Sequence, residues 1–317
     1  MSSIPASLYQ FKCLRAFAGL LWLLLWAPAI CLANETHVEV VLSGNAAPYQ
    51  EFVISLKRQL PENIELSVLE SPGKFPDSSK SPDLIVAVGQ KAADWVSSRT
   101  QLPVLATMIF SSSYESLLSS HNGGQISGVF VDQPLERQLR LLHYALPQSR
   151  HIGVLLSRQS DSNLEVLRSQ LKNQGDTLVA EHVDASTPLF QSLEDLLVRS
   201  DVLFVLPDRA IYNSNTIRNI LLSSYRHKVP LIGLSNSYVN AGALCAIYST
   251  PQQLAIQTKE IIVQFGHEEK LPAASYPEYF KVAVNHEVAT MLDISIHSAA
   301  QLELLVKKEE RVSDAEQ

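Results

Sequence analysis

The sequence predicts an α/β protein made of two Rossmann-like lobes, each a parallel sheet with helices on its faces, joined by a multi-strand hinge. Three observations support this prediction. Strand and helix signals alternate regularly from His37 onward. The strand signals are continuous apolar runs, which are typical of parallel strands covered on both faces. The alternation then starts again after residues 132–134, so the chain contains two βα arrays of roughly 100 residues each.

The elements of the first array follow from apolar runs and amphipathic patterns between turn residues. Pro61 ends the first helix, and the Ser-Pro-Gly turn at 71–73 ends the second strand. The Pro- and Ser-rich segment 72–82 has no helix signal, so we expect a short helical turn or a reduced connection there. The expected strands are 37–43, 64–70, 83–89, 103–109 and 126–132, the expected helices are 47–60 and 90–98, and a Ser-rich loop or short helix spans 111–122.

The second array begins with the strongest helical pattern of the chain. Leucines recur on one face of residues 135–147, and Pro134 stands where prolines commonly open helices. The most complete βαβ unit follows at 200–244, where two apolar strands each end in polar residues. The expected strands are 151–157, 177–183, 202–206, 229–234 and 279–284, and the expected helices are 135–147, 161–173, 188–198, 251–265 and 286–292, with one more inside the βαβ unit.

These patterns divide the chain into four parts. The predicted parts are a signal peptide (1–33), an N-terminal lobe (34–131 plus 243–272), a C-terminal lobe (132–242 plus 273–298) and a charged tail (299–317). We expect residues 238–244 to begin the passage back to the first lobe. The end of the tail is expected to be solvated or disordered, because it is highly charged.

The first 33 residues have the pattern of a cleavable secretory signal. Two basic residues precede an apolar run, and small residues at two places allow cleavage after Ala29 or Ala33, of which we favour Ala33. A membrane anchor is the alternative, but the run is shorter than the ~20 residues that a spanning helix needs. Lipid attachment at Cys31 is disfavoured because the bulky Ile30 precedes it.

Composition and missing motifs exclude several function classes. Removal of the signal takes away two basic residues and no acidic one, which changes the formal net charge from −7 to −9 and disfavours nucleic acid as a partner. Cys245 would then be the only cysteine, and its apolar neighbours indicate buried packing. The sequence contains no Gly-rich phosphate motif, no metal-binding histidine pair and no catalytic constellation. We therefore predict no enzyme activity, no cofactor and no metal.

Function is expected at the carboxyl ends of the strands, where ligands collect in open α/β sheets. Two lobes joined by several strands can close on a small molecule in a cleft between them. Loop side chains and helix N-termini would supply the hydrogen bonds.

Four segments resemble one known family. They are 128–157 (GVFVDQPLERQLRLLHYALPQSRHIGVLLS), 202–213 (VLFVLPDRAIYN), 238–244 (YVNAGAL) and 282–294 (VAVNHEVATMLDI). Their order and spacing are similar to those of ABC-transporter substrate-binding proteins related to tryptophan- and tyrosine-binding proteins. The resemblance covers most of the mature chain and implies the type I periplasmic-binding fold. It also implies a non-catalytic protein of the periplasm that binds an amino acid or related small molecule for an inner-membrane ABC permease.

The resemblance further implies where such a ligand would bind. Asp208 is the first candidate for the ligand's ammonium group, and Asp132 is the second. Tyr212 and Tyr238 would flank an apolar or aromatic group, with ordinary packing inside the lobe as the alternative for both. The candidate hydrogen-bonding residues are Ser43, Asn45, Gln90, Ser111, Ser157, Ser235 and Asn236.

Two expected ligand loops depart from the family pattern. Residues 109–113 (IFSSS) stand where the family usually has a Thr-Asp-Pro-like turn, and residues 157–160 (SRQS) stand near its Glu-Asn-Ser stretch. Alternatives to an importer component therefore stay open. One is a sensory or scaffold module of the same fold that signals to a membrane partner, and another is a secreted α/β enzyme.

Overall fold

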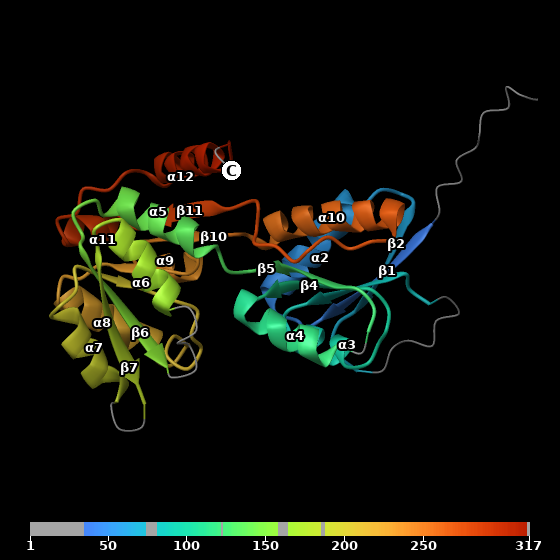
Figure 1. Ribbon diagram of the computed structural model, residues 1–317, viewed down its shortest axis with the longest axis horizontal. Coiled ribbons are helices and arrows are strands. Elements are labelled where there is room, and N and C mark those ends of the chain that lie inside the picture. Colours follow the sequence, from blue (N-terminus) through green and yellow to red (C-terminus); the bar gives the residue numbers. More distant parts are fainter. Residues whose placement is uncertain (1–34, 74–80, 122, 158–163, 185–187, 316–317) are drawn as a thin grey trace, which may run out of the picture. The chain divides into compact units, whose positions relative to one another are not determined.

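Two sheets organise the protein (Figure 1). The computed structural model describes residues 35–73, 81–121, 123–157, 164–184 and 188–315. The first sheet has the strand order β2-β1-β3-β4-β5 and is parallel throughout. The second has the order β11-β10-β9-β8-β6-β7 and is parallel except for β11, which runs antiparallel to β10. The predicted fold class is confirmed, with one antiparallel edge strand added.

The first sheet is buried on both faces, as its apolar strands predict. Its strands are β1 (Thr36–Leu42), β2 (Ile64–Leu69), β3 (Leu84–Val88), β4 (Val104–Ile109) and β5 (Ile126–Phe130). Helices α2 (Ala47–Gln59) and α10 (Pro251–Glu268) pack on one face, and α3 (Gln90–Ser97) and α4 (Tyr114–Ser120) pack on the other (Figure 1). Phe52 and Ile262 enter the first of these cores, and Val96 and Leu117 enter the second.

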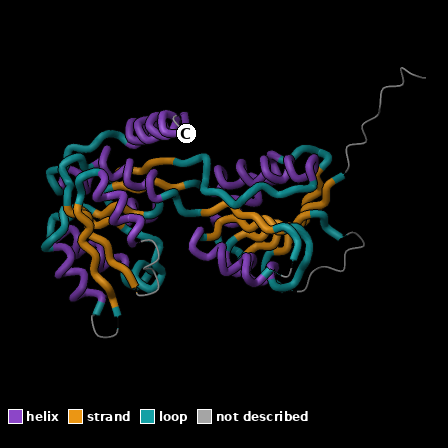
Figure 2. Tube along the Cα trace, in the orientation of Figure 1, coloured by secondary structure: helices purple, strands orange, loops and turns teal. Residues whose placement is uncertain are grey.

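The second sheet has the same layered construction, with orange strands between purple helices in Figure 2. Its strands are β6 (His151–Ser157), β7 (Thr177–Val183), β8 (Val202–Phe204), β9 (Leu231–Gly233), β10 (Cys245–Tyr248) and β11 (Lys281–Val284). One face carries α5 (Leu135–Ala145), α6 (Leu164–Asn173), α11 (His286–Met291) and α12 (Ala299–Ala315), and the other carries α7 (Leu189–Leu197), α8 (Ile217–Arg226) and α9 (Asn236–Ala241). Cys245 lies in this core, where burial raises the pKa of its thiol to about 12, as expected for a packing residue.

Two boundaries of the predicted division must be corrected. Residues 243–248 do not return to the first lobe, because β10 pairs with β9 and β11 in the second sheet. The chain passes to the first lobe one step later, at Thr250, whose side chain caps α10 in a capping box with Gln253. The predicted charged tail is largely a helix, α12, and its Leu302 and Val306 are fully buried in the core of the second sheet.

Three connections join the two sheets, and hydrogen bonds tie them to one another. Gln133 lies in the β5–α5 connection, Ser249 in the β10–α10 connection, and Tyr279 in the α10–β11 connection. Gln133 Nε2 donates to Ser249 Oγ at 2.9 Å, and Ser249 Oγ donates to the Tyr279 carbonyl oxygen at 2.6 Å. The predicted multi-strand hinge is therefore a hydrogen-bonded bundle of connections.

Some predictions fall where the structure gives no description. The signal peptide (1–33), most of the segment 72–82 and the altered loop 158–160 lie outside the described residues. Within the described ranges, no helix combines the length and the apolar character needed to cross a membrane.

Candidate functional site

The loops after β1 and β3 come together at the carboxyl edge of the first sheet. Ser43 Oγ accepts a hydrogen bond of 3.0 Å from the backbone N–H of Ala92, in the first turn of α3. Gly89 has φ of 83°, and a Cβ atom there would lie 2.6 Å from Tyr49 Oη and 2.7 Å from Ser43 Oγ. Glycine is therefore required for Ser43 and Tyr49 to lie this close to the start of α3.

A β-bulge in β4 precedes the next loop at the carboxyl edge of the first sheet. The pairing of β4 with β5 shifts between Thr107 and Ile109, and the intervening Met108 has a positive φ of 56°. Bulges re-aim the side chains that follow them and occur often beside functional sites. Here the bulge stands directly before Phe110 and Ser111, the residues that leave the sheet.

Asp132, which follows β5, is bonded to this loop through both carboxylate oxygens. Its Oδ1 accepts from the backbone N–H of Ser111 at 2.8 Å, and its Oδ2 accepts from Ser111 Oγ at 2.6 Å. Burial raises the pKa of Asp132, and the hydrogen bonds from Ser111 offset part of that rise. The site thus holds an oriented carboxylate with reduced solvation.

On the second sheet, Asp208 holds the loop after β8 against the end of β6. It is only 6% exposed. Its Oδ2 accepts from the backbone N–H of Ser157 at 2.8 Å, and its Oδ1 accepts from the backbone N–H of Ala210 at 3.0 Å. The structure therefore gives Asp208 a role in loop organisation, while its binding of an ammonium group stays a prediction.

The two candidate tyrosines are both packed into the second lobe. Tyr212 is a buried member of the core under this edge. Burial raises the pKa of Tyr212, and the charges of Tyr238 and Asp208 add to the rise. Tyr238 is half-buried and lies on Gly233, where a Cβ atom would come within 2.4 Å of the Tyr238 Cβ atom. Contact of either ring with a ligand stays a prediction.

Among the described residues, a cation–π contact joins the carboxyl edges of the two sheets. The guanidinium carbon of Arg209, beside Asp208, lies 5.4 Å from the centre of the Phe110 ring, beside Ser111. The loop after β4 and the loop after β8 therefore face each other. Our sequence analysis did not select Phe110 or Arg209, although each adjoins a selected residue at a strand end.

Four other predicted residues make no such contact between the sheets. Gln90 Nε2 donates to Asp94 of its own helix at 2.8 Å. Ser235 occupies the N-cap position of α9 without forming a side-chain cap. Asn45 and Asn236 are exposed. A ligand role for these four residues stays a prediction.

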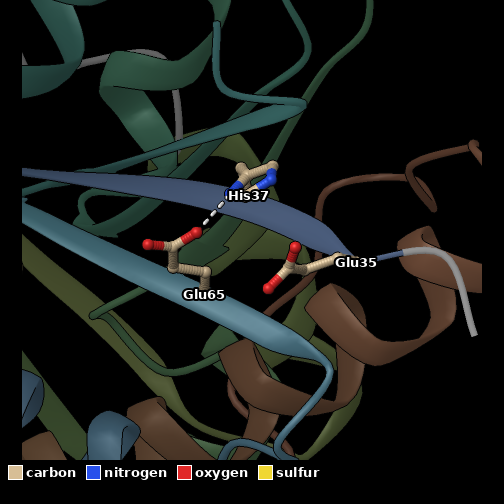
Figure 3. A group of neighbouring side chains, drawn as sticks. All are labelled: Glu35, His37 and Glu65. Atoms are coloured by element: carbon tan, nitrogen blue, oxygen red, sulfur yellow. Dashed lines mark ion pairs between the residues drawn. The ribbon is translucent and has the colours of Figure 1, made fainter. Parts of the chain in front are cut away.

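A histidine–glutamate pair lies at the opposite, amino ends of β1 and β2. His37 Nδ1 is 2.8 Å from Glu65 Oε2 (Figure 3). The figure also draws Glu35, the residue directly before β1. Because ligands of parallel sheets bind at the carboxyl ends, we do not assign this pair to the candidate site.

Comparison with known proteins relates most of the chain to one family. A family model described as ABC transporter substrate binding protein matches residues 77–309. A relative named tyrosine-binding protein, from Clostridioides difficile, is 23% identical over 246 residues, which are 75% of this chain and 70% of the relative.

Solved structures share the fold. A ligand-free, open structure of a substrate binding protein with adhesive properties from Clostridium difficile has a TM-score of 0.63 at 20% identity, over 83% of this chain and 96% of that one. An ABC domain from Streptococcus pneumonia, solved in complex with L-Trp, has a TM-score of 0.59 at 20% identity, over 83% and 96%. At these identities the structural likeness establishes the fold alone.

Proposed function

We propose that this chain, which belongs to the ABC transporter substrate-binding protein family, binds a small molecule, an amino acid or a related compound, between the carboxyl edges of its two sheets. One relative named above is called a tyrosine-binding protein and one of the solved structures contains L-Trp, so aromatic amino acids are the first ligands to test. The protein would deliver this ligand to an inner-membrane ABC permease from the periplasm, after export by the signal at 1–33. It would perform no chemistry on the ligand.

The contact between Phe110 and Arg209 is the observation that supports this proposal most directly. It comes from two loops that follow strands of different sheets, which is where ligands bind in α/β proteins. Around it stand the oriented carboxylate of Asp132 and the loop that Asp208 holds in place. A small molecule between these loops would contact both sheets, and its binding energy would favour their approach.

A thermal-shift screen of the mature protein tests the proposal. The screen covers the common amino acids, with tryptophan and tyrosine first, and calorimetry then measures the dissociation constant of each hit. A ligand present at 100 times its dissociation constant stabilises the folded state by about 2.7 kcal/mol. If no amino acid changes the melting temperature or releases heat, an amino-acid-binding function is excluded.

The partnership with a permease needs a separate measurement. The mature protein, loaded with the ligand found in the screen, would be added to a matching ABC transporter in proteoliposomes. We expect the ATP hydrolysis rate of the transporter to rise only with the loaded protein. An unchanged rate with every ABC transporter of the same organism would argue against an importer role.

A further inference from the structure

The two loops that meet at Phe110 each carry a charge that is free for a ligand. Within the described ranges, neither the carboxylate of Asp132 nor the guanidinium of Arg209 forms an ion pair. The carboxylate of Asp132 accepts hydrogen bonds from the uncharged Ser111, and the guanidinium group of Arg209 lies over the uncharged Phe110 ring. The edge of the first sheet thus offers an anion, and the edge of the second sheet offers a cation.

Asp132 is prepared to accept an ammonium group. The two bonds from Ser111 fix its orientation, yet each carboxylate oxygen keeps a further lone pair for a second donor. Burial disfavours the ionised form of this carboxyl group, so a cation placed beside it would relieve an existing cost. A ligand ammonium group has both the charge and the donors that this requires.

Arg209 is prepared to accept a carboxylate. The Phe110 ring lies against the guanidinium group, and stacking of this kind leaves the N–H groups at the edge of the guanidinium plane available. A planar fork of N–H donors matches the two oxygens of a carboxylate. The two oxygens of the neighbouring Asp208 accept hydrogen bonds from the backbone N–H groups of Ser157 and Ala210.

We propose that the site recognises the zwitterion of an α-amino acid, with Asp132 binding the ammonium group and Arg209 binding the carboxylate. Arg209 contacts Phe110 and Asp132 is bonded to Ser111. Phe110 and Ser111 are adjacent in the sequence, so the positive and the negative side chain lie beside neighbouring residues of one loop. In an α-amino acid the two charges are likewise neighbours, on one carbon atom. This inference rests on the proposed function and deepens it, because it names the two residues that select the ligand class.

Calorimetry with three forms of each aromatic ligand tests the proposal. The probes are L-tyrosine with tyrosinamide, which lacks the carboxylate, and 3-(4-hydroxyphenyl)propionate, which lacks the ammonium group. L-tryptophan, tryptophanamide and indole-3-propionate form the second series. Arg209→Gln should weaken the amino acid and the propionate by roughly 10- to 100-fold, the range expected for a lost charge-assisted hydrogen bond, and leave the amide unchanged. Asp132→Asn should weaken the amino acid and the amide by a similar factor and leave the propionate unchanged.

Matched controls separate this recognition from a change of net charge. Arg218→Gln and Asp195→Asn remove the same charges at exposed positions of α8 and α7, and both should bind all probes like the wild type. If the site variants weaken all three forms of a ligand equally, or none, the zwitterion assignment is wrong while the proposed function stands. If the wild-type protein binds neither amino acid, the proposed function fails at its first test and this inference fails with it.

Discussion

Replacement of Arg137 by methionine should be among the most destabilising single changes in this protein. Arg137 is 8% exposed and lies at the start of α5, beside the connections between the sheets. Its Nε donates to Glu310 Oε1 at 2.6 Å, and its Nη1 donates to Gln133 Oε1 at 2.8 Å and to the Pro277 carbonyl oxygen at 2.6 Å. Its guanidinium carbon also lies 4.4 Å from the centre of the Phe280 ring. One side chain therefore links α12 to two of the three connections.

Methionine keeps much of the stem of Arg137 but leaves three acceptors without their donor. Removal of one member of a buried charged pair costs about 3–5 kcal/mol. We expect the lower end, about 3 kcal/mol, because Arg140 Nη1 lies 3.8 Å from Glu310 Oε1 and can compensate in part. That loss corresponds to a melting temperature lower by about 6–12 °C.

Urea and thermal unfolding, followed by circular dichroism, measure this loss. Arg168→Met is the matched control, because Arg168 is half-exposed and its ion pair with Glu165, at 3.6 Å, is on the surface. The control should cost less than about 1 kcal/mol. Equal stability of the two variants would show that the Arg137 network does not stabilise the connections between the sheets.

Three further predictions concern single positions. Gly233→Ala should lower the free energy of unfolding in urea by about 1–3 kcal/mol, because the new Cβ would lie 2.4 Å from the Tyr238 Cβ atom. An unchanged urea midpoint would mean that α9, which carries Tyr238, can shift away without cost. Burial raises the folded-state pKa of Asp132 above its ordinary 3.8, so the folded protein binds a proton here more tightly than the unfolded chain does. The stability of the wild type relative to Asp132→Asn should therefore rise as the pH falls from 7 through that raised pKa. This gain should be complete below 3.8, and a difference that shrinks on acidification would contradict it. Leu302→Ala in α12 should cost about 2–5 kcal/mol, whereas Leu304→Ala, at a position that is 67% exposed, should cost little. Equal melting temperatures would contradict the packing of α12 on the second sheet.

Regular local patterns made most of the fold predictable. The run Leu84–Val88 is apolar without interruption, and it forms β3 with every residue buried. The wrong boundaries arose where the deciding interaction is distant in sequence. Residues 245–248 form β10 of the second sheet, where this strand pairs with β9 on one side and with β11, which follows α10 in the chain, on the other. In the tail the charges dominated our interpretation, although Leu302 and Val306 have the four-residue spacing of an apolar helix face.

The candidate site was predictable only as a set of strand ends. Rules for α/β sheets pointed to the loops at strand ends, and the family resemblance then singled out Ser111, Asp132 and Asp208 within such loops. The sequence could not reveal that the backbone N–H groups of Ser157 and Ala210 engage Asp208. Nor could it reveal the contact of Phe110 with Arg209, which depends on the folding of both sheets.

Hydrogen–deuterium exchange of the mature protein, with and without saturating L-tyrosine or L-tryptophan, tests the central claim most directly. That claim is one ligand site built from loops of both sheets. We predict slower exchange on ligand addition in two separate stretches, residues 109–113 of the first lobe and residues 206–213 of the second. Protection confined to one of these stretches, or found in neither, would contradict a ligand site shared by the two sheets.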